Sequence, residues 1–418
     1  MPGGIDAHTH FDLPAGDTVT ADDFASGTKA AIFGGTTTII DYATQFKGET
    51  LADGLVNWQA KADGRCYCDY GFHMAITDWQ AGTAREMADM VQNRGISSFK
   101  LYMAYKNSLQ VDDGVLLAAL MQAKQCGALI ALHCENGDVV HTLAAKYLAA
   151  GKTAPAYHAL SRPLAAEAEA TNRAVALAEI AQAPLYVVHL TNGRALQVIA
   201  EAKLRGVEVY AETCPQYLLL DESYYRRAGF EGAKYVISPP LRPAENQTLL
   251  WDGLRIGVLD TVGTDHCSFN YRGQKEAGID DFSKIPNGMP GVENRIALLY
   301  TYGVLTGRLN LNQLVAVTAT RPAQLFGLFP RKGTIAPGSD ADIVVWNPQE
   351  SMVISAQTQV SRGDYAPYEG FQQVGQATHV FLRGRQVVAG GKLKDTTPGG
   401  VYLFRQPFVP RRQLKNFV

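Results

Sequence analysis

Several features that would assign a protein to a particular class are missing from this sequence of 418 residues. Charged residues make up only 19% of it, the net charge is -2, and no long run carries a single sign, so the surface has little attraction for nucleic acid or an anionic membrane. The most apolar stretch, residues 114–133, is interrupted by polar side chains and makes a poor membrane span. We therefore expect a small, uncharged partner, and no binding to nucleic acid or membrane.

Cysteine is too scattered to form a disulfide framework. The six cysteines lie within hydrophobic segments, and no basic stretch followed by an apolar one precedes the first motif. Both observations predict a cytoplasmic location. The sequence also has no GxGxxG, Walker loop, GxSxG or HExxH, so the common motifs for nucleotide binding, serine hydrolysis and zinc proteolysis do not apply.

What the sequence does contain is a regular alternation of strand-like and helix-like segments. Short runs of β-branched, aromatic and small apolar residues alternate with segments whose apolar residues recur at three- and four-residue steps. Eight nearly continuous apolar strands separated by helices predict an α/β fold, a TIM-type (β/α)8 barrel, with an open doubly wound sheet as the alternative. The expected strands are residues 3–11, 36–43, 66–76, 97–105, 128–135, 184–191, 207–215 and 258–267.

The character of the sequence changes after residue 330. From Gly333 onward, KGTIAPGSDADIVVWNP and THVFLRGRQVVAGGKL consist of short strands joined by Gly, Pro and Asp turns, without helical periodicity. We predict the barrel over residues 1–332 and a small β domain over residues 333–400. Residues 401–418, rich in Pro, Arg and aromatics, are expected to form an extended C-terminal arm packed on a neighbour.

Histidine and other ionisable residues stand at or near the ends of otherwise apolar strands. His8 and His10 in MPGGIDAHTHF project from one face of the first strand, because side chains alternate along a strand. In an α/β barrel the active site lies at the C-terminal strand ends, where such residues indicate chemistry. A single histidine there is most often a satisfied core residue, but four together favour a metal centre. The candidate residues are His8, His10, Lys100, His133, His189 and Asp265.

Lys100 is the least expected of these residues, because its segment FKLYMAY is otherwise apolar. An unpaired ammonium in such surroundings is costly or loses its proton. One explanation is an ion pair with Asp265 or Glu135. The other is a neutral amine that captures carbon dioxide as a carbamate, whose two oxygens could bridge two divalent ions. Imidazole and oxygen donors together make zinc the expected metal.

The ordered set of motifs carries a resemblance that covers nearly the whole chain. It resembles the dihydropyrimidinase and hydantoinase family of cyclic amidohydrolases, and within that family the D-phenylhydantoinase type. The motifs that carry the resemblance are PGGIDAHTHF, SSFKLYMAY, ALHCEN, YVVHLTN, ETCPQYLLLD, SPPLR, TDHC, IPNGMPGVENR and GTIAPGSDADIVVW.

The resemblance implies a binuclear metal centre, a catalytic pair and a homotetramer. Lys100, carbamylated, would bridge the two ions, and Asp265 would also shuttle a proton while Tyr105 donates to the oxyanion. Ser238 and Asn287 would bind the cyclic amide through their backbones. The ligands of the first metal would be His8, His10 and Asp265, and those of the second would be His133 and His189.

From the residues alone, the substrate-binding positions have plainer interpretations. Tyr105 is equally well an interfacial aromatic residue. Ser238 precedes two prolines that fix an extended path, which could present a rigid backbone edge or could be only a turn. Asn287 lies in a Gly- and Pro-rich loop, where such a side chain commonly satisfies its own backbone.

The sequence departs from the family at its start. Family members carry β-strands ahead of the GxxDxHxH strand, and these pair with the C-terminal strands into a sandwich. We therefore expect a small β-sandwich-like domain formed by the C-terminal region, with its N-terminal half absent and an edge left open.

The resemblance predicts hydrolytic ring opening of cyclic diamides to N-carbamoyl products. Asp12 stands where relatives that bind dihydroorotate have an arginine, so a neutral ring is expected. 5-Substituted hydantoins such as phenylhydantoin come first, because Tyr102 and Leu109 flank the end of the Lys100 strand and would face the ring substituent. The alternatives are dihydrouracil or dihydrothymine, then allantoin, and lastly a non-enzymatic assembly protein that keeps the barrel.

Overall fold

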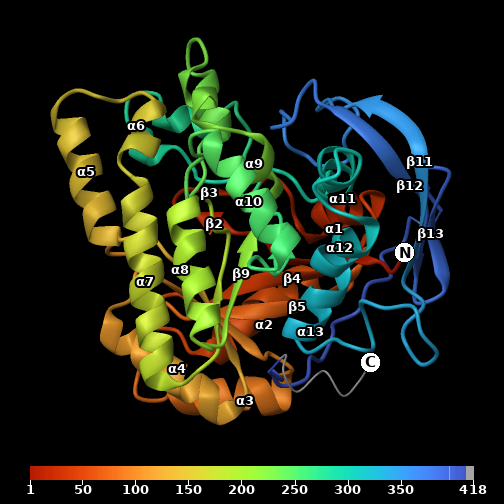
Figure 1. The fold of residues 1–418 in the computed structure, drawn as a ribbon, viewed down its shortest axis with the longest axis horizontal. Helices are drawn as coiled ribbons and strands as arrows, with labels where there is room; N and C mark the ends of the chain where they lie inside the picture. Colours follow the sequence, from red (N-terminus) through yellow and green to blue (C-terminus); the bar gives the residue numbers. More distant parts are fainter. Residues whose placement is uncertain (395, 411–418) are drawn as a thin grey trace.

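Eight parallel strands form the centre of the molecule, as the sequence predicts (Figure 1). The structure is a computed structural model that describes residues 1–394 and 396–410. The strands of the barrel are almost entirely buried, which explains why they read as continuous apolar runs. Their bounds are β1 Gly4–Thr9, β4 Thr36–Thr44, β5 Asp69–Ala75, β6 Ser98–Tyr102, β7 Leu129–His133, β8 Leu185–Val187, β9 Val209–Thr213 and β10 Thr261–Val262.

The strands follow one another around the barrel in sequence order. Each is parallel to the next, from β1 paired with β4 to β9 paired with β10. A parallel bridge between Thr9 and His266 joins the two ends of the sheet, and the backbone amide of His10 donates to the carbonyl of His266 at 2.7 Å. The ends of β1 and β10 therefore meet, and the TIM-type barrel predicted from the sequence is confirmed.

Helices cover the outer face of the barrel (Figure 1). Several begin at a capping side chain, for example Asp112 before α4 and Asn192 before α8, which accept hydrogen bonds from the first turn. Across the residues that the structure describes, no helix is both long and apolar enough to cross a membrane. The larger barrel helices are α1 Phe24–Phe33, α2 Leu51–Ala62, α3 Thr83–Arg94, α4 Asp113–Cys126, α5 Gly137–Ala149, α7 Leu164–Ala181, α8 Gly193–Leu204 and α10 Glu245–Ile256. The shorter ones are α6 Ala156–Leu160, α9 Pro215–Leu219, α11 Arg295–Leu299, α12 Leu311–Val315 and α13 Arg321–Leu325.

A small antiparallel sheet lies beside the barrel, in blue at the right of Figure 1. Its strands are β11 Ile343–Val353, β12 Gln372–Leu382, β13 Arg385–Ala389 and β14 Lys392–Leu393, in that order across the sheet. The edge at β11 is extended by the first residues of the chain, since Pro2 bridges to Ile343 and the Met1 ammonium donates to the carbonyl of Val344 at 2.9 Å. Within the described residues this domain is a single sheet rather than a sandwich, because the buried side chains of its inner face, such as Val380, pack toward the barrel.

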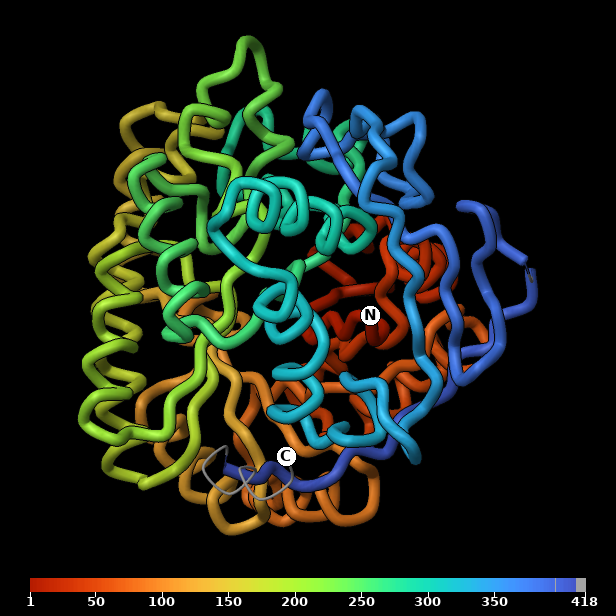
Figure 2. Tube along the Cα trace, turned by 45° about the vertical axis from the view of Figure 1, so that its right-hand side comes forward, coloured from red at the N-terminus to blue at the C-terminus, as the bar shows by residue number. Residues whose placement is uncertain are grey.

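Residues 401–410 run across the end of the barrel opposite to the C-terminal strand ends (Figure 2). Their backbone pairs with β5 through Tyr70, and further along the amide of Phe408 donates to the carbonyl of Gly127 at 2.8 Å. Arg405 is fully buried there, where its guanidinium donates to the Ser98 hydroxyl at 2.9 Å and to the Phe72 carbonyl. This part of the predicted arm lies on the chain's own barrel, whereas residues 411–418 fall outside the described residues.

Candidate active site

The barrel topology brings the six predicted ligand residues to one end of the sheet. His8 lies in β1 and His10 directly after it, Lys100 lies in β6, and His133 is the last residue of β7. His189 and Asp265 follow the short strands β8 and β10. All six line a single cavity of about 770 Å³. Residues that are more than 250 positions apart in the sequence thus become neighbours because C-terminal strand ends converge in a parallel barrel.

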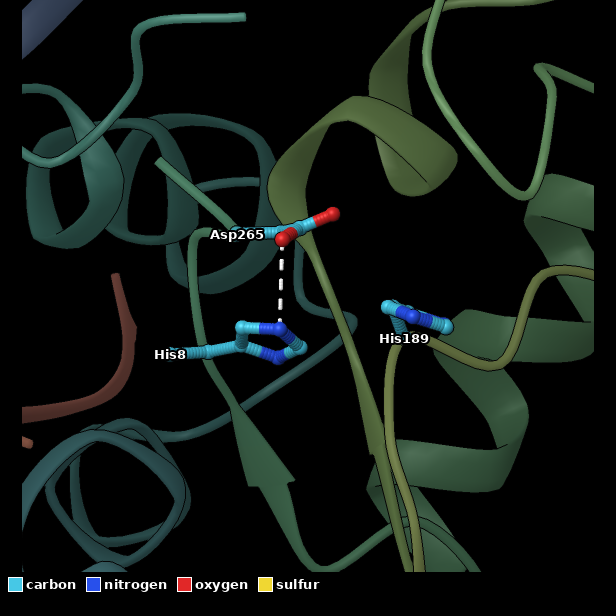
Figure 3. Close-up of side chains that lie close together, drawn as sticks. All are labelled: His8, His189 and Asp265. Carbon is cyan, nitrogen blue, oxygen red and sulfur yellow. Dashed lines mark ion pairs between the residues drawn. The ribbon is translucent and has the colours of Figure 1, made fainter. Parts of the chain in front are cut away.

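Asp265 lies between the two histidines of the first strand. Its Oδ1 atom is 3.1 Å from Nε2 of His8 and 3.1 Å from Nε2 of His10. Figure 3 shows the ion pair to His8, with the ring of His189 beside that of His8 and below the carboxylate in this view. Burial alone would raise the pKa of Asp265, but the two imidazoles hold it well below its usual range, so the carboxylate stays ionised.

His133 and His189 form a second pair of imidazoles. Nδ1 of His133 is 2.9 Å from Nε2 of His189, and the ring centroids are 4.6 Å apart. The other nitrogen of His133, Nε2, lies 2.8 Å from a carboxylate oxygen of Glu135, which fixes the ring orientation. The nitrogens that face each other are therefore directed to one small volume between the two strands.

Lys100 is buried beside these groups without a carboxylate partner. Its exposed fraction is 1%, and its Nζ atom lies 5.0 Å from the ring centroid of Tyr42. Burial lowers the pKa of Lys100 to about 8, against the opposing influence of Asp265 and Glu212. No described carboxylate forms an ion pair with it, and Glu135 is paired with Arg162 at 2.6 Å instead. The ion-pair explanation for Lys100 therefore has no support in the structure.

The donor set fits divalent metal ions. Burial lowers the pKa of His10, His133 and His189, which keeps these rings in the neutral form that binds metal. Nε2 of His8 and Nδ1 of His189 are buried, and among the described residues neither has a hydrogen-bond partner of good geometry. One donor atom from each of His8, His189 and Asp265 lies within 4.8 Å of the others, a possible site for one ion.

The backbone is strained at three of the residues that surround this cluster. Tyr105, His189 and Asp265 have φ values of 69°, 39° and 53°, in the left-handed region that side chains rarely adopt. Such conformations persist where the surrounding structure over-determines them, and they cluster at functional sites. Here each one turns a strand end so that its side chain lines the cavity.

The five residues predicted to contact substrate all line the same cavity: Tyr102, Tyr105, Leu109, Ser238 and Asn287. The ring of Tyr105 lies 5.3 Å from that of His133, and burial raises the pKa of Tyr105 to about 12, so the phenol keeps its proton. Tyr102 is 8% exposed and lies at the wall of the cavity rather than inside the barrel core, with its ring edge to face with that of Tyr105 and the centroids 6.0 Å apart. The structure therefore brings together every residue that the sequence predicted for the site.

Two buried carboxylates that support the site were not singled out from the sequence. Glu212 in β9 lies 2.5 Å from Nδ1 of His8 and also accepts from the hydroxyl of Tyr186 at 2.9 Å. Asp6 in β1 accepts from the backbone amide and hydroxyl of Thr264, next to Asp265, at 3.1 and 2.7 Å. A signal existed for both, because each is a carboxylate within an apolar strand, as Lys100 is a lysine within one.

Comparison with known proteins identifies the family to which this architecture belongs. The model of the Amidohydrolase family matches residues 1–387, most of the chain. The chain belongs to the amidohydrolase family. This amidohydrolase is 50% identical over 408 residues to a D-hydantoinase of Geobacillus stearothermophilus, covering 98% of this chain and 87% of the relative. It is 44% identical over 412 residues to a D-phenylhydantoinase of Escherichia coli O1:K1 / APEC, covering 98% and 88%.

A solved structure agrees with the sequence comparisons. The crystal structure of the dihydropyrimidinase from Brevibacillus agri NCHU1002 superimposes on this amidohydrolase with a TM-score of 0.97 at 50% identity, covering 98% of this chain and 88% of that one. The resemblance to the dihydropyrimidinase and hydantoinase family that the motifs indicate is confirmed.

Proposed function

We propose that this amidohydrolase opens cyclic diamides by hydrolysis, with 5-substituted hydantoins such as 5-phenylhydantoin as substrates and N-carbamoyl amino acids as products. The observation that carries the proposal is the meeting of four histidines, Asp265 and a buried lysine without an ion-pair partner in one cavity, where ring nitrogens of His8 and His189 also lack hydrogen-bond partners among the described residues. The relatives named D-hydantoinase and D-phenylhydantoinase support it.

The proposed metal centre uses the cluster of ionisable side chains. His8, His10 and Asp265 would hold one divalent ion and His133 and His189 a second, with Lys100 as a carbamate bridging them and zinc as the metal. The lowered pKa of Lys100 supports this role, because carbon dioxide reacts with the neutral amine. When bound, such ions supply hydroxide at neutral pH and polarise the scissile carbonyl.

The chain's own residues would move the proton and stabilise the charge that develops. Water adds its oxygen to the carbonyl carbon while Asp265, ionised and held between His8 and His10, accepts the proton. When the carbon–nitrogen bond breaks, Asp265 returns that proton to the ring nitrogen that leaves. Tyr105, whose phenol stays protonated, would donate to the oxygen that becomes negative.

Substrate binding would combine a polar edge and an apolar wall. The backbones of Ser238 and Asn287 would hydrogen-bond the planar amide of the ring, which the candidate substrates share. Tyr102 and Leu109 would face the substituent, and burying apolar groups there favours a phenyl or alkyl substituent over hydrogen. Discrimination between rings would therefore come from the loops rather than from the metal ligands.

A second candidate substrate class is the dihydropyrimidines, dihydrouracil and dihydrothymine. The similarity to the dihydropyrimidinase structure favours it. Allantoin is a weaker candidate, and a non-enzymatic assembly role is disfavoured by the retention of all six ligand-type residues at the site.

The test is an assay of hydantoin, 5-phenylhydantoin, dihydrouracil and allantoin with the purified protein, accompanied by elemental analysis. We expect ring opening of 5-phenylhydantoin, two zinc ions per chain and loss of activity with a chelator that added zinc reverses. Absence of bound metal from active protein, or no ring opening of any of the four, would contradict the proposal.

We also propose a domain organisation, a cellular location and an oligomeric state for this protein. The chemistry would reside in residues 1–332, with the small domain over 333–400 and the C-terminal arm over 401–418. The six free cysteines support a cytoplasmic location, since a reducing compartment keeps thiols unpaired. We propose a homotetramer, which light scattering of the purified protein would measure.

A further inference from the structure

Lys275 is a buried lysine near the active-site cavity whose contacts differ from those of Lys100. It begins the short helix η3 (Lys275–Gly278) and is 0% exposed. Its ammonium donates to the backbone carbonyl of Val236 at 3.0 Å and to that of Pro286 at 2.9 Å. None of the described carboxylates forms an ion pair with it, so these two backbone carbonyls are its hydrogen-bond acceptors. The side chain thus joins two loops that are 50 residues apart in the sequence.

The first loop that Lys275 holds is the one with Ser238. Every carbonyl around Ser238 in residues 236–239 has a donor from another segment. Val236 accepts from Lys275, Ile237 accepts from His158 Nε2 at 2.7 Å, and Pro239 accepts from the hydroxyl of Tyr217 at 2.8 Å. In contrast, no described residue makes a hydrogen bond with the backbone of Ser238, which lines the cavity.

The second loop shows the same arrangement around Asn287. The carbonyl of Pro286 accepts from Lys275, and the amide of Gly288 donates to the carbonyl of Val236 at 3.0 Å. Among the described residues, nothing hydrogen-bonds the backbone of Asn287 itself. Two peptide units that lack partners within the described residues, between fixed neighbours and both at the cavity, leave donors and acceptors available to a ligand.

Lys275 therefore contacts both loops at the point where they meet. Val236 accepts from Lys275 and from Gly288, so one carbonyl ties the Ser238 loop to the ammonium and to the Asn287 loop at once. We propose that Lys275 is a positioning residue that fixes the separation of the Ser238 and Asn287 backbones, and so sets the fit of the cavity to the planar amide edge of a ring.

Burying a lysine at this position costs more free energy than burying an apolar side chain, so we expect the lysine to have a specific role. An apolar side chain of similar length, such as methionine, would occupy the same volume without removing an ammonium from water. The burial also lowers the pKa of Lys275 to about 7. What a methionine could not supply is two donors directed to carbonyls on different loops.

The inference rests on the proposed function, because it assumes that the two backbones bind the ring. Their contacts to the amide would be the same in the ground state and the transition state, so their displacement should weaken binding more than it slows the chemical step. In Lys275→Met we expect KM for 5-phenylhydantoin to rise about tenfold or more, with kcat within about threefold of wild type and metal content unchanged.

A matched control is available at the opposite end of the barrel. Lys203 donates to the carbonyl of Val258 at 2.8 Å and to the carboxylate of Asp260 at 2.7 Å, so it also ties a loop to a helix, but away from the cavity. Lys203→Met should leave KM and kcat unchanged. Should Lys275→Met not fold, Lys275→Gln, which is too short to span both carbonyls, is expected to show the same rise in KM.

Hydrogen exchange separates this inference from the proposed function. In Lys275→Met, the hydrogen-bonded backbone amides of Val236, Ile285 and Gly288 should exchange faster than in wild type or Lys203→Met, whatever the substrate. If wild type opens none of the rings, the proposed function fails, while faster exchange still supports the role of Lys275 in joining the loops. An active wild type whose folded Lys275 variants have normal KM, or a loss confined to kcat, overturns the inference.

Discussion

Nδ1 of His8 lies 2.5 Å from the carboxylate of Glu212, on the side of the ring that faces away from Asp265. The same carboxylate accepts from the backbone amide of His189 at 3.2 Å. One buried side chain in β9 therefore orients residues that are proposed to hold two different ions. Such a partner fixes the tautomer of a ligand histidine and raises its basicity.

Glu212→Gln tests this arrangement. The amide keeps the shape of the side chain but loses the charge that favours a His8 ring with its proton on Nδ1, so we expect metal affinity to fall about 10- to 100-fold. Competition with a chromophoric chelator measures it. Glu201→Gln, on the exposed face of α8, is the control, and equal affinity in the two variants would contradict the prediction.

Lys100→Ala should lose both metal and activity. The variant removes the amine that is proposed to carry the carbamate, and a short carboxylic acid such as propionate should restore part of the activity by occupying the vacated position. Elemental analysis and an activity assay with and without the acid measure both effects. Lys124→Ala, an exposed lysine on α4, should behave as wild type. Undiminished activity in Lys100→Ala would end the carbamate hypothesis.

Substrate preference should depend on Tyr102. A hydrophobic pocket gains about 0.8 kcal/mol per buried methylene, so kcat/KM for 5-phenylhydantoin should exceed that for dihydrouracil by one or two orders of magnitude. Tyr102→Ala should narrow this gap and leave metal content intact. If dihydrouracil is the better substrate, or if the variant lowers both rates equally, the dihydropyrimidinase alternative replaces the hydantoinase proposal.

The contact between Glu293 and the loop that joins β11 to β12 should make the stability of the protein depend on pH. The carboxyl of Glu293 accepts from the backbone amide of Val360 at 2.8 Å, and burial raises the pKa of Glu293 to about 7. Between about pH 4.5 and 7 the unfolded chain has already lost this proton while the folded chain keeps it, so this group's contribution to stability falls as pH rises.

Glu293→Gln removes that dependence. Relative to wild type, its thermal midpoint should rise between pH 5 and pH 8, which differential scanning fluorimetry can follow. Glu350→Gln, at an exposed glutamate within β11, serves as the control and should show the same pH profile as wild type. Parallel pH profiles for Glu293→Gln and wild type would show that Glu293 does not keep its proton in the folded protein.

The barrel and the ligand cluster could be predicted because their signals are local. An apolar strand that ends in a histidine, or encloses Lys100, stands out within ten residues of sequence, and barrel topology then brings such ends together. Glu212 has the same signal in VEVYAETCP, but a lone carboxylate in a strand also has structural explanations and does not by itself indicate a site.

Other features could not be predicted because they depend on distant segments. Lys275 lies in a polar stretch, YRGQKEAG, where an exposed lysine is the ordinary expectation. Its burial follows only when the loops around Val236 and Pro286 close over it. Similarly, the edge of the small sheet at β11 is extended by a bridge from Pro2 and a hydrogen bond from Met1, contacts across more than 340 positions.

The position of Arg405 and its neighbours determines when the barrel can close during synthesis. The end of the barrel opposite to the cavity is covered by a segment that leaves the ribosome after all eight barrel strands, and that segment supplies donors to carbonyls of β5 and to Ser98 in β6. Until this segment emerges, a nascent barrel has its strands, but the end opposite to the cavity is uncovered and the backbone at β5 lacks its partners. This end of the barrel can therefore close only after residues 401–408 have been made, and a ribosome that stalls before residue 401 would release a chain whose β5 backbone lacks these partners.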